Sequence, residues 1–205
     1  MLSDTPPERD IEWTDTGAEG CWRFVNRIYR LCTESEGLAA PGTAVTAADE
    51  ASKALRQAAH KAIAAVTEHL EHLRFNSAVA QLYTLSNAVA GAIGGANAID
   101  GAVLREALEA IVLLSAPMMP HLAEECWKAL GHTKLVAETS WPRHDPALTA
   151  SNLVTYPVQV NGKLRVSFQI ERDTDQKTVE AKALSFEEVQ RALDGKAPKK
   201  VIVVL

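Results

Sequence analysis

Residues 100–131 read DGAVLREALEAIVLLSAPMMPHLAEECWKALG, and this stretch decides the fold. Asp100 opens a predicted helix, because its side chain can accept from backbone N–H groups that the first helical turn leaves without partners. Pro117 and Pro120 end this helix and start another, since proline is tolerated in a first turn but not in a helix interior. The second helix is expected to end at Gly131. Apolar residues of the first helix recur at helical spacing: Leu104, Ala107, Leu108, Ile111 and Leu114.

The same helical period occurs three more times before this stretch. Thr16 and Glu19 form a capping-box pattern at the start of the first helix, Thr46 can cap the second, and Asn76 can cap the third. Apolar residues follow these caps at helical spacing: Cys21, Val25, Ile28 and Cys32; Leu55, Ala59, Ala62, Val66, Leu70 and Leu73; Val79, Leu82 and Val89. Five amphipathic helices joined by short loops predict a mainly α fold, an antiparallel bundle over residues 16–131.

The pattern changes after the bundle. Residues 132–152 are irregular, and from Tyr156 onward apolar and polar residues alternate on both sides of Asn161-Gly162. Because both central positions of a tight hairpin turn need positive φ, Asn-Gly between two alternating runs predicts a β-hairpin. Further elements are then expected over the following ranges: a helix over Thr174–Ala183, a helix that Ser185 caps and that ends near Gly195, and a strand over Lys200–Leu205. Residues 153–205 therefore read as a small α+β domain of the order β-β-α-α-β.

Charge and composition exclude several classes of protein. The net charge of -5 argues against a general polyanion binder. Residues 1–152 carry a balance of -7 and residues 153–205 a balance of +2, so the second module is the one suited to an anionic partner. No apolar run reaches the ~20 residues of a membrane span, and the acidic N-terminus does not resemble a secretion signal, so a cytoplasmic location is expected. The three cysteines form no Cys-x-x-Cys pair and suit neither a zinc ribbon nor a disulfide framework.

Two groups of basic residues are candidate binding sites. Arg23, Arg27 and Arg30 stand at i, i+4 and i+7 on the first helix and are expected to be unpaired. They form either a solvated face or a line of phosphate contacts, since guanidinium groups bind phosphate in a bidentate fork. Lys163 and Arg165 share one face of the predicted hairpin.

A second cluster, Lys196, Lys199 and Lys200, precedes the expected final strand. The basic residues of the second module either block association of sheet edges or contact a nucleic-acid backbone.

Other motifs carry no visible chemistry. Residues 68–72, Glu-His-Leu-Glu-His, lack a third metal ligand and are interpreted as an exposed helix end. His121 is interpreted as a structural residue, because no nucleophile lies near it in sequence. Gly91, Gly94 and Gly95 lack the Gly-Lys-Ser/Thr of a phosphate loop and mark a turn. The residues alone thus predict a helical module and a small α+β module without an active site.

Four segments together resemble the leucyl-tRNA synthetase family, and they span almost the whole chain. Residues 19–31, EGCWRFVNRIYRL, resemble the first helix of the family's anticodon-binding bundle, and residues 74–82, RFNSAVAQL, the start of its third. Residues 116–127, APMMPHLAEECW, are similar to the Pro-x-x-Pro-His-x-x-Glu-Glu-x-Trp motif that the enzymes for leucine, isoleucine, valine and methionine share. Residues 158–165, VQVNGKLR, resemble the hairpin of the small C-terminal domain in bacterial leucine enzymes, which narrows the resemblance to leucine.

The resemblance implies a division of the chain. Residues 1–15 would connect to a catalytic core outside this chain, 16–131 would form the anticodon-binding bundle, 132–152 a linker, and 153–205 a C-terminal tRNA-binding domain. The family's Lys-Met-Ser-Lys-Ser loop, His-Ile-Gly-His signature and editing domain are absent from this sequence. The full-length parent is therefore expected to be a leucine–tRNA ligase that uses ATP and Mg²⁺. This chain alone is expected to have no catalytic residue, no cofactor and no metal.

The implied partners are tRNA(Leu) and the catalytic core of the same polypeptide, in a monomer without membrane contact. Because leucine has several codons, the bundle need not read anticodon bases and would hold the tRNA through its shape and backbone. Seven residues are the candidates for tRNA contact: Arg23, Arg27, Arg30, Lys163, Arg165, Lys199 and Lys200.

Two alternatives stay open. One is the same region of an isoleucine- or valine-type synthetase, which a comparison of the three tRNAs would separate. The other is a non-enzymatic helical module that binds a protein partner, which predicts no affinity for tRNA and an exposed apolar patch.

Overall fold

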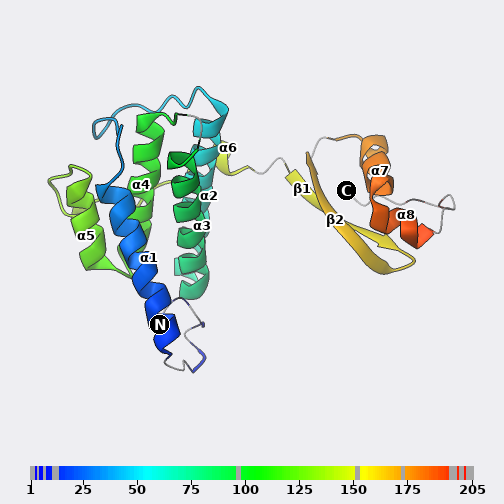
Figure 1. Cartoon of the computed structure of the whole chain (residues 1–205), viewed down its shortest axis with the longest axis horizontal. Helices are drawn as coiled ribbons and strands as arrows, with labels where there is room; N and C mark the ends of the chain where they lie inside the picture. Colours follow the sequence, from blue (N-terminus) through cyan, green and yellow to red (C-terminus); the bar gives the residue numbers. More distant parts are fainter. Residues whose placement is uncertain are drawn as a thin grey trace. The chain divides into compact units, whose positions relative to one another are not determined.

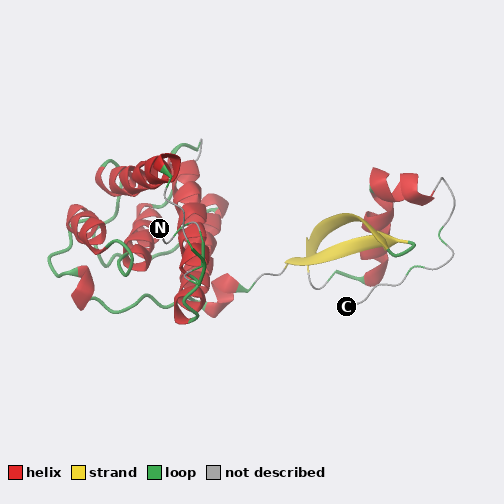
Figure 2. Ribbon diagram, turned by 90° about the horizontal axis from the view of Figure 1, so that it is seen from below, coloured by secondary structure: helices red, strands yellow, loops and turns green. Residues whose placement is uncertain are grey.

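The computed structural model describes residues 3, 5–6, 8–10, 14–95, 98–150, 153–171, 174–193, 198 and 201. The chain divides into two compact units, Met1–Thr149 and Ala150–Leu205. The first unit is a helical bundle, and the second contains a β-hairpin and two helices (Figures 1 and 2). The predicted fold, a mainly α bundle followed by a small α+β module, is confirmed.

The bundle consists of the five predicted helices. In it, α2 (Glu50–Glu71) and α3 (Phe75–Ile93) lie side by side, and α4 (Gly101–Ser115) packs against both. The first helix, α1 (Asp15–Thr33), packs mainly on α5 (Pro120–Ala129) (Figure 1). Each helix thus buries its apolar stripe against neighbours within the first unit.

The core lies around α4. Leu108, Ile111 and Leu114 of the predicted stripe are fully buried, and so are Val103 and Val112 beside it. Eleven of the 15 residues of α4 are buried, which places α4 at the centre of the bundle.

A buried arginine ties α4 to two chain segments. Arg105 is 8% exposed, and its guanidinium donates to the carbonyl of Leu130 at 2.7 Å and to the carbonyl of Ala39. It also pairs with Glu109 at 3.2 Å. Arg105 therefore holds the connection between α1 and α2 and the end of α5 on the core helix.

Two predicted helix caps are wrong. Thr14, not Thr16, caps α1, because the Thr14 side chain accepts from the backbone of Gly17. Asp49, not Thr46, caps α2, since Ala47 has a φ of 43° and a helix cannot run through that left-handed position. The Thr46 hydroxyl instead donates to the Asp100 carboxylate at 3.2 Å.

The start of α3 also differs from the prediction, whereas the start of α4 agrees. The N-cap position of α3 is Arg74, which makes no side-chain cap, so Asn76 lies inside the first turn. Leu73, predicted on the apolar stripe of α2, has a φ of 56° and is 59% exposed because α2 has already ended. Asp100 caps α4 as predicted and accepts from Ala102 at 2.8 Å.

The segment after the bundle is more ordered than predicted. It contains a 3-10 turn, Val136–Glu138, and a short helix, α6 (Pro146–Thr149). The Trp141 indole donates to the hydroxyl of Thr67 on α2 at 2.8 Å. Further along, the backbone N–H of Asp145 donates to the imidazole of His60 on the same helix at 2.9 Å. This segment therefore runs along α2.

The second unit contains the predicted hairpin. Strands β1 (Leu153–Val160) and β2 (Lys163–Glu171) pair antiparallel, and Asn161 and Gly162 between them have φ values of 51° and 77°. The turn prediction is confirmed. Phe168 and Ile170 of β2 pack with Val179 of α7 in a small core of their own.

The two helices of this unit shift slightly from their predicted positions. Asp175 caps α7 (Gln176–Ser185), and α8 spans Glu187–Leu193. Ser185, predicted to cap α8, is the last residue of α7, and its hydroxyl donates to the carbonyl of Lys182 at 2.7 Å. The predicted end of the second helix near Gly195 lies outside the described residues, as does the predicted final strand apart from Val201. No helix in the described part of the chain has the length and apolarity needed to cross a membrane.

Candidate nucleic-acid interface

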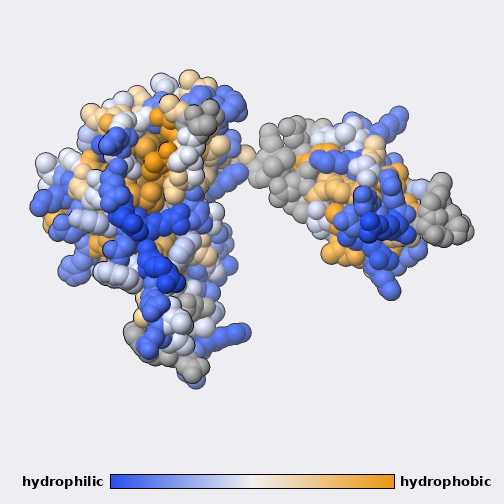
Figure 3. All heavy atoms as spheres, viewed as in Figure 1, coloured by the Kyte–Doolittle hydropathy of each residue, from blue (hydrophilic) through white to orange (hydrophobic). Residues whose placement is uncertain are grey.

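The orientation of α1 places its arginines at the surface. Its buried residues lie about one turn apart: Phe24, Ile28 and Cys32. The opposite side therefore faces solvent, and Arg23 and Arg30 are exposed there, whereas Arg27 is half-buried. Figure 3 shows strongly hydrophilic residues along α1. Arg23 and Arg30 therefore lie opposite the apolar face of α1, and Arg27 lies nearer the edge of that face.

The prediction that all three arginines are unpaired is wrong. Arg23 lies 3.7 Å from the Glu19 carboxylate in an exposed pair, which is a weak contact. Arg27 donates to the carbonyl of Ser86 on α3 at 3.3 Å. Arg30 makes no ion pair with any residue that the structure describes. The three side chains therefore differ in how freely they can reach a phosphate.

Arg27 and Arg30 line a groove between α1 and α3. The groove has a volume of about 310 Å³, and its other lining residues are Leu31, Glu34, Ser35, Ala90 and Ile93. Ile93, the last residue of α3, is 45% exposed. The groove thus combines two cations with an apolar wall.

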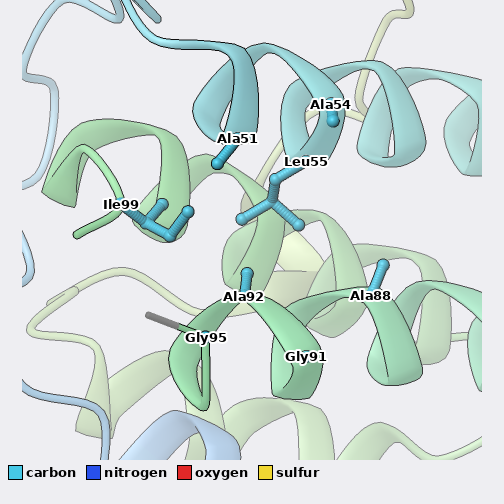
Figure 4. Close-up of a pocket in the computed structure, with 8 residues that line it drawn as sticks. All are labelled: Ala51, Ala54, Leu55, Ala88, Gly91, Ala92, Gly95 and Ile99. Carbon is cyan, nitrogen blue, oxygen red and sulfur yellow. The ribbon is translucent and has the colours of Figure 1, made fainter. Parts of the chain in front are cut away.

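A second groove of similar size lies between α2 and α3 but offers no polar side chain. Figure 4 shows Leu55 of α2 pointing toward Ala92 of α3, with Ile99 beside them. The remaining lining residues are alanines and glycines: Ala51, Ala54, Ala88, Gly91 and Gly95. This groove therefore has no group that could bind a charged ligand or catalyse a reaction.

Sequence reasoning missed two exposed aromatic residues on α1. Trp22 is 68% exposed and Tyr29 is 45% exposed. They stand seven residues apart, two helical turns, so they share one flank of α1. The sequence signal for these two residues is their spacing, which places both on a side of α1 away from the buried residues Phe24 and Ile28.

The hairpin of the second unit presents Lys163 and Arg165 to solvent. Both are exposed, and alternate residues of β2 share one face of the strand. The pairing of Lys163 with Val160 across the Asn161-Gly162 turn fixes their position. Lys199 and Lys200, the other predicted candidates of this unit, lie outside the described residues.

Reactive groups elsewhere have structural partners. Glu68, at the predicted exposed helix end, pairs with Arg74 at 2.6 Å. Cys32 and Cys126 are buried free thiols, and the hydrogen bond between them together with burial raises the pKa of Cys32 far above its usual range. Cys32 is therefore a neutral, unreactive thiol at physiological pH.

The described residues contain neither a cluster of metal ligands nor a phosphate loop. No group of three or more His, Cys, Asp or Glu side chains among them could hold a metal ion. Gly91 and Gly94 lie at the end of α3, where no lysine follows to reach a phosphate.

Comparison with known proteins identifies relatives over the full chain. The family model described as the anticodon-binding domain of tRNA ligase matches residues 52–181. A leucine–tRNA ligase of Parvibaculum lavamentivorans is 54% identical over 207 residues, which cover 100% of this chain and 24% of that protein. A leucine–tRNA ligase of Mesorhizobium japonicum is 53% identical over 211 residues, with the same coverage. The chain spans about a quarter of the length of the curated relatives it matches.

A solved structure is similar in fold. It is the LeuRS of Agrobacterium radiobacter, determined in a ternary complex with tRNA and LeuAMS. The TM-score is 0.75 at 26% sequence identity, and the match covers 99% of this chain and 27% of that one.

Proposed function

The chain belongs to the family of anticodon-binding domains of tRNA ligases, and from this premise we propose that it binds tRNA(Leu) for a leucine–tRNA ligase. The observation that carries the proposal is the similarity of the whole chain to leucine–tRNA ligases at 54% identity. The structure adds exposed cations on two rigid elements, a helix and a hairpin. The proposed role is to position the tRNA while the rest of such a ligase attaches leucine to it.

The proposed chemistry of the full ligase lies outside this chain. Leucine activation with ATP and Mg²⁺ and transfer to tRNA are assigned to the part of the ligase that the matched quarter does not include. This chain contributes the free energy of tRNA binding to the reaction. Correct placement of the tRNA end lowers the barrier to transfer, because two bound reactants no longer lose translational and rotational freedom.

The proposed contacts are to the tRNA backbone. Arg23, Arg27 and Arg30 offer guanidinium groups on α1, and Lys163 and Arg165 offer charges at the tip of the hairpin. Guanidinium and ammonium groups neutralise phosphates without reading bases. Lys199 and Lys200 belong to the same proposal on sequence grounds alone, as further cations of the second unit.

Removal of the hairpin cations should weaken tRNA binding. We expect Lys163→Ala plus Arg165→Ala to reduce affinity for a tRNA(Leu) transcript by ~1–2 kcal/mol at moderate salt, because two charge-assisted phosphate contacts are lost from a rigid element. Fluorescence anisotropy of a labelled transcript measures the change, and circular dichroism checks that the variant is folded.

The matched control also removes one lysine and one arginine, but from the two helices of the second unit instead of the hairpin. Lys177 is exposed on α7, and Arg191 on α8 forms an exposed pair with Glu187. Lys177→Ala plus Arg191→Ala should weaken binding much less, through long-range charge alone. Equal losses in the two double variants would show that the hairpin is not a contact.

A further inference from the structure

We propose that the groove between α1 and α3 is a subsite for one ribonucleotide of the tRNA. This inference rests on the proposed tRNA binding and assigns it a place in the bundle. Arg27 and Arg30 bind the phosphate, Ile93 and Leu31 contact the apolar face of the sugar or base, and Glu34 accepts from a ribose hydroxyl.

The phosphate position follows from the two arginines. The bond from Arg27 to the carbonyl of Ser86 fixes its guanidinium at the groove and leaves its other N–H groups free to donate. Arg30 is exposed and makes no ion pair with a described residue, so its charge is available without breaking another contact. One anchored and one free guanidinium can hold a single phosphate between them.

The size and lining of the groove suit a nucleoside unit. Its volume of about 310 Å³ lies at the lower end of the ~300–1,000 Å³ range of small-molecule sites. Leu31, Ala90 and Ile93 form an apolar wall, and Ile93 keeps 45% of its surface exposed when nothing covers it. A sugar ring or base face laid on this wall would remove apolar surface from water.

The presence of Glu34 indicates that the groove binds a ribonucleotide rather than a bare phosphate. Glu34 lines the groove together with the two arginines, and its negative charge alone would repel a phosphate. A carboxylate is an acceptor, however, and a ribose 2′-hydroxyl is a donor that DNA lacks. Glu34 therefore favours RNA by accepting from the sugar while the arginines bind the phosphate.

A substitution that fills the groove without changing charge tests the site. Ala90→Leu places a larger apolar side chain in the groove, and Ala80→Leu places the same side chain at an exposed position of α3 outside it. With a labelled tRNA(Leu) transcript as the probe, Ala90→Leu should weaken binding about fivefold to tenfold. Ala80→Leu should leave binding unchanged.

Two pairs of charge variants test the contacts. Arg30→Ala should weaken binding about tenfold, whereas Lys61→Ala, which removes an exposed cation of α2 that is neither in the groove nor among the proposed contacts, should weaken it about threefold or less. Removing a negative charge should strengthen tRNA binding in general. Glu34→Ala should instead weaken it about threefold, while Glu36→Ala, an exposed acid outside the groove, should strengthen it slightly.

The outcomes separate this inference from the function on which it rests. A wild-type chain that fails to bind the transcript contradicts the proposed function. If the wild type binds, equal affinities of the two leucine variants, equal losses in Arg30→Ala and Lys61→Ala, or tighter binding by Glu34→Ala overturns the subsite. If Ala90→Leu lowers the thermal unfolding midpoint, the exposed pairs Arg30/Lys61 and Glu34/Glu36 decide the question by themselves.

Discussion

Replacing Trp127 by alanine should lower the free energy of unfolding of the bundle by about 3–5 kcal/mol, the usual cost of removing a buried tryptophan side chain. Trp127 on α5 is 5% exposed and belongs to the core of the bundle. Its ring stacks on His132 with centroids 3.6 Å apart and an angle of 4° between the planes. Alanine would leave a cavity beneath this stack.

Urea unfolding measures the loss of Trp127. All four tryptophans precede residue 150, so the fluorescence of Trp22 and Trp141 in the variant still reports the first unit alone. Trp127→Phe keeps an aromatic ring in the cavity and should cost much less. An unchanged unfolding midpoint for Trp127→Ala would show that the ring is exposed in solution and would reopen a role in binding.

Loss of the Arg105 side chain should destabilise the bundle by about 3 kcal/mol, because removing one partner leaves buried groups without hydrogen bonds. Arg105→Met keeps most of the volume but leaves two carbonyls, those of Ala39 and Leu130, without their donor. Glu109 keeps one partner, since His132 lies 2.8 Å from its carboxylate. The cost therefore arises mainly from the two carbonyls.

Arg105→Lys tests whether the positive charge or the forked shape of the guanidinium group stabilises the bundle. A lysine retains the positive charge but lacks the forked guanidinium that reaches several acceptors at once, so its stability should lie between those of wild type and Arg105→Met. The same fluorescence-detected urea titration measures all three proteins. The account of this hydrogen-bonded site is wrong if Arg105→Met unfolds at the wild-type urea concentration.

Elements set by local chemistry could be predicted from the sequence. Asp100 before an apolar stripe, and Pro117 and Pro120 after it, fixed both ends of α4 because capping and the missing N–H of proline act within one turn. Asn161-Gly162 fixed the hairpin for the same reason, since positive φ at both positions is a local requirement.

Competing caps could not be resolved from the sequence alone. Thr46 and Asp49 both precede the apolar stripe of α2, and either side chain can cap a helix. The choice depends on the chain before α2, where Ala47 adopts a positive φ and Thr46 bonds to Asp100, which lies 54 residues later. Such a long-range contact leaves no periodic signal.

The arginine stripe was found in sequence, but the groove beside it was not. The i, i+4 and i+7 spacing places Arg23, Arg27 and Arg30 along one helix. The contact of Arg27 with Ser86 and the contribution of Ile93 arise because α3 packs beside α1. Helical spacing within α1 carries no information on which residues of another helix complete the site.

A titration of the whole chain with tRNA across salt concentrations tests the proposed binding of tRNA(Leu). We expect binding of a tRNA(Leu) transcript, tighter than that of valine and isoleucine transcripts at each salt concentration, because the cations on the helix and the hairpin select a tRNA by its shape rather than by its bases. The logarithm of the affinity should fall linearly with the logarithm of salt, with a slope of magnitude roughly five to six if the seven proposed cations each neutralise one phosphate. No binding of tRNA(Leu) at low salt, or equal affinity for the three tRNAs, would contradict the account.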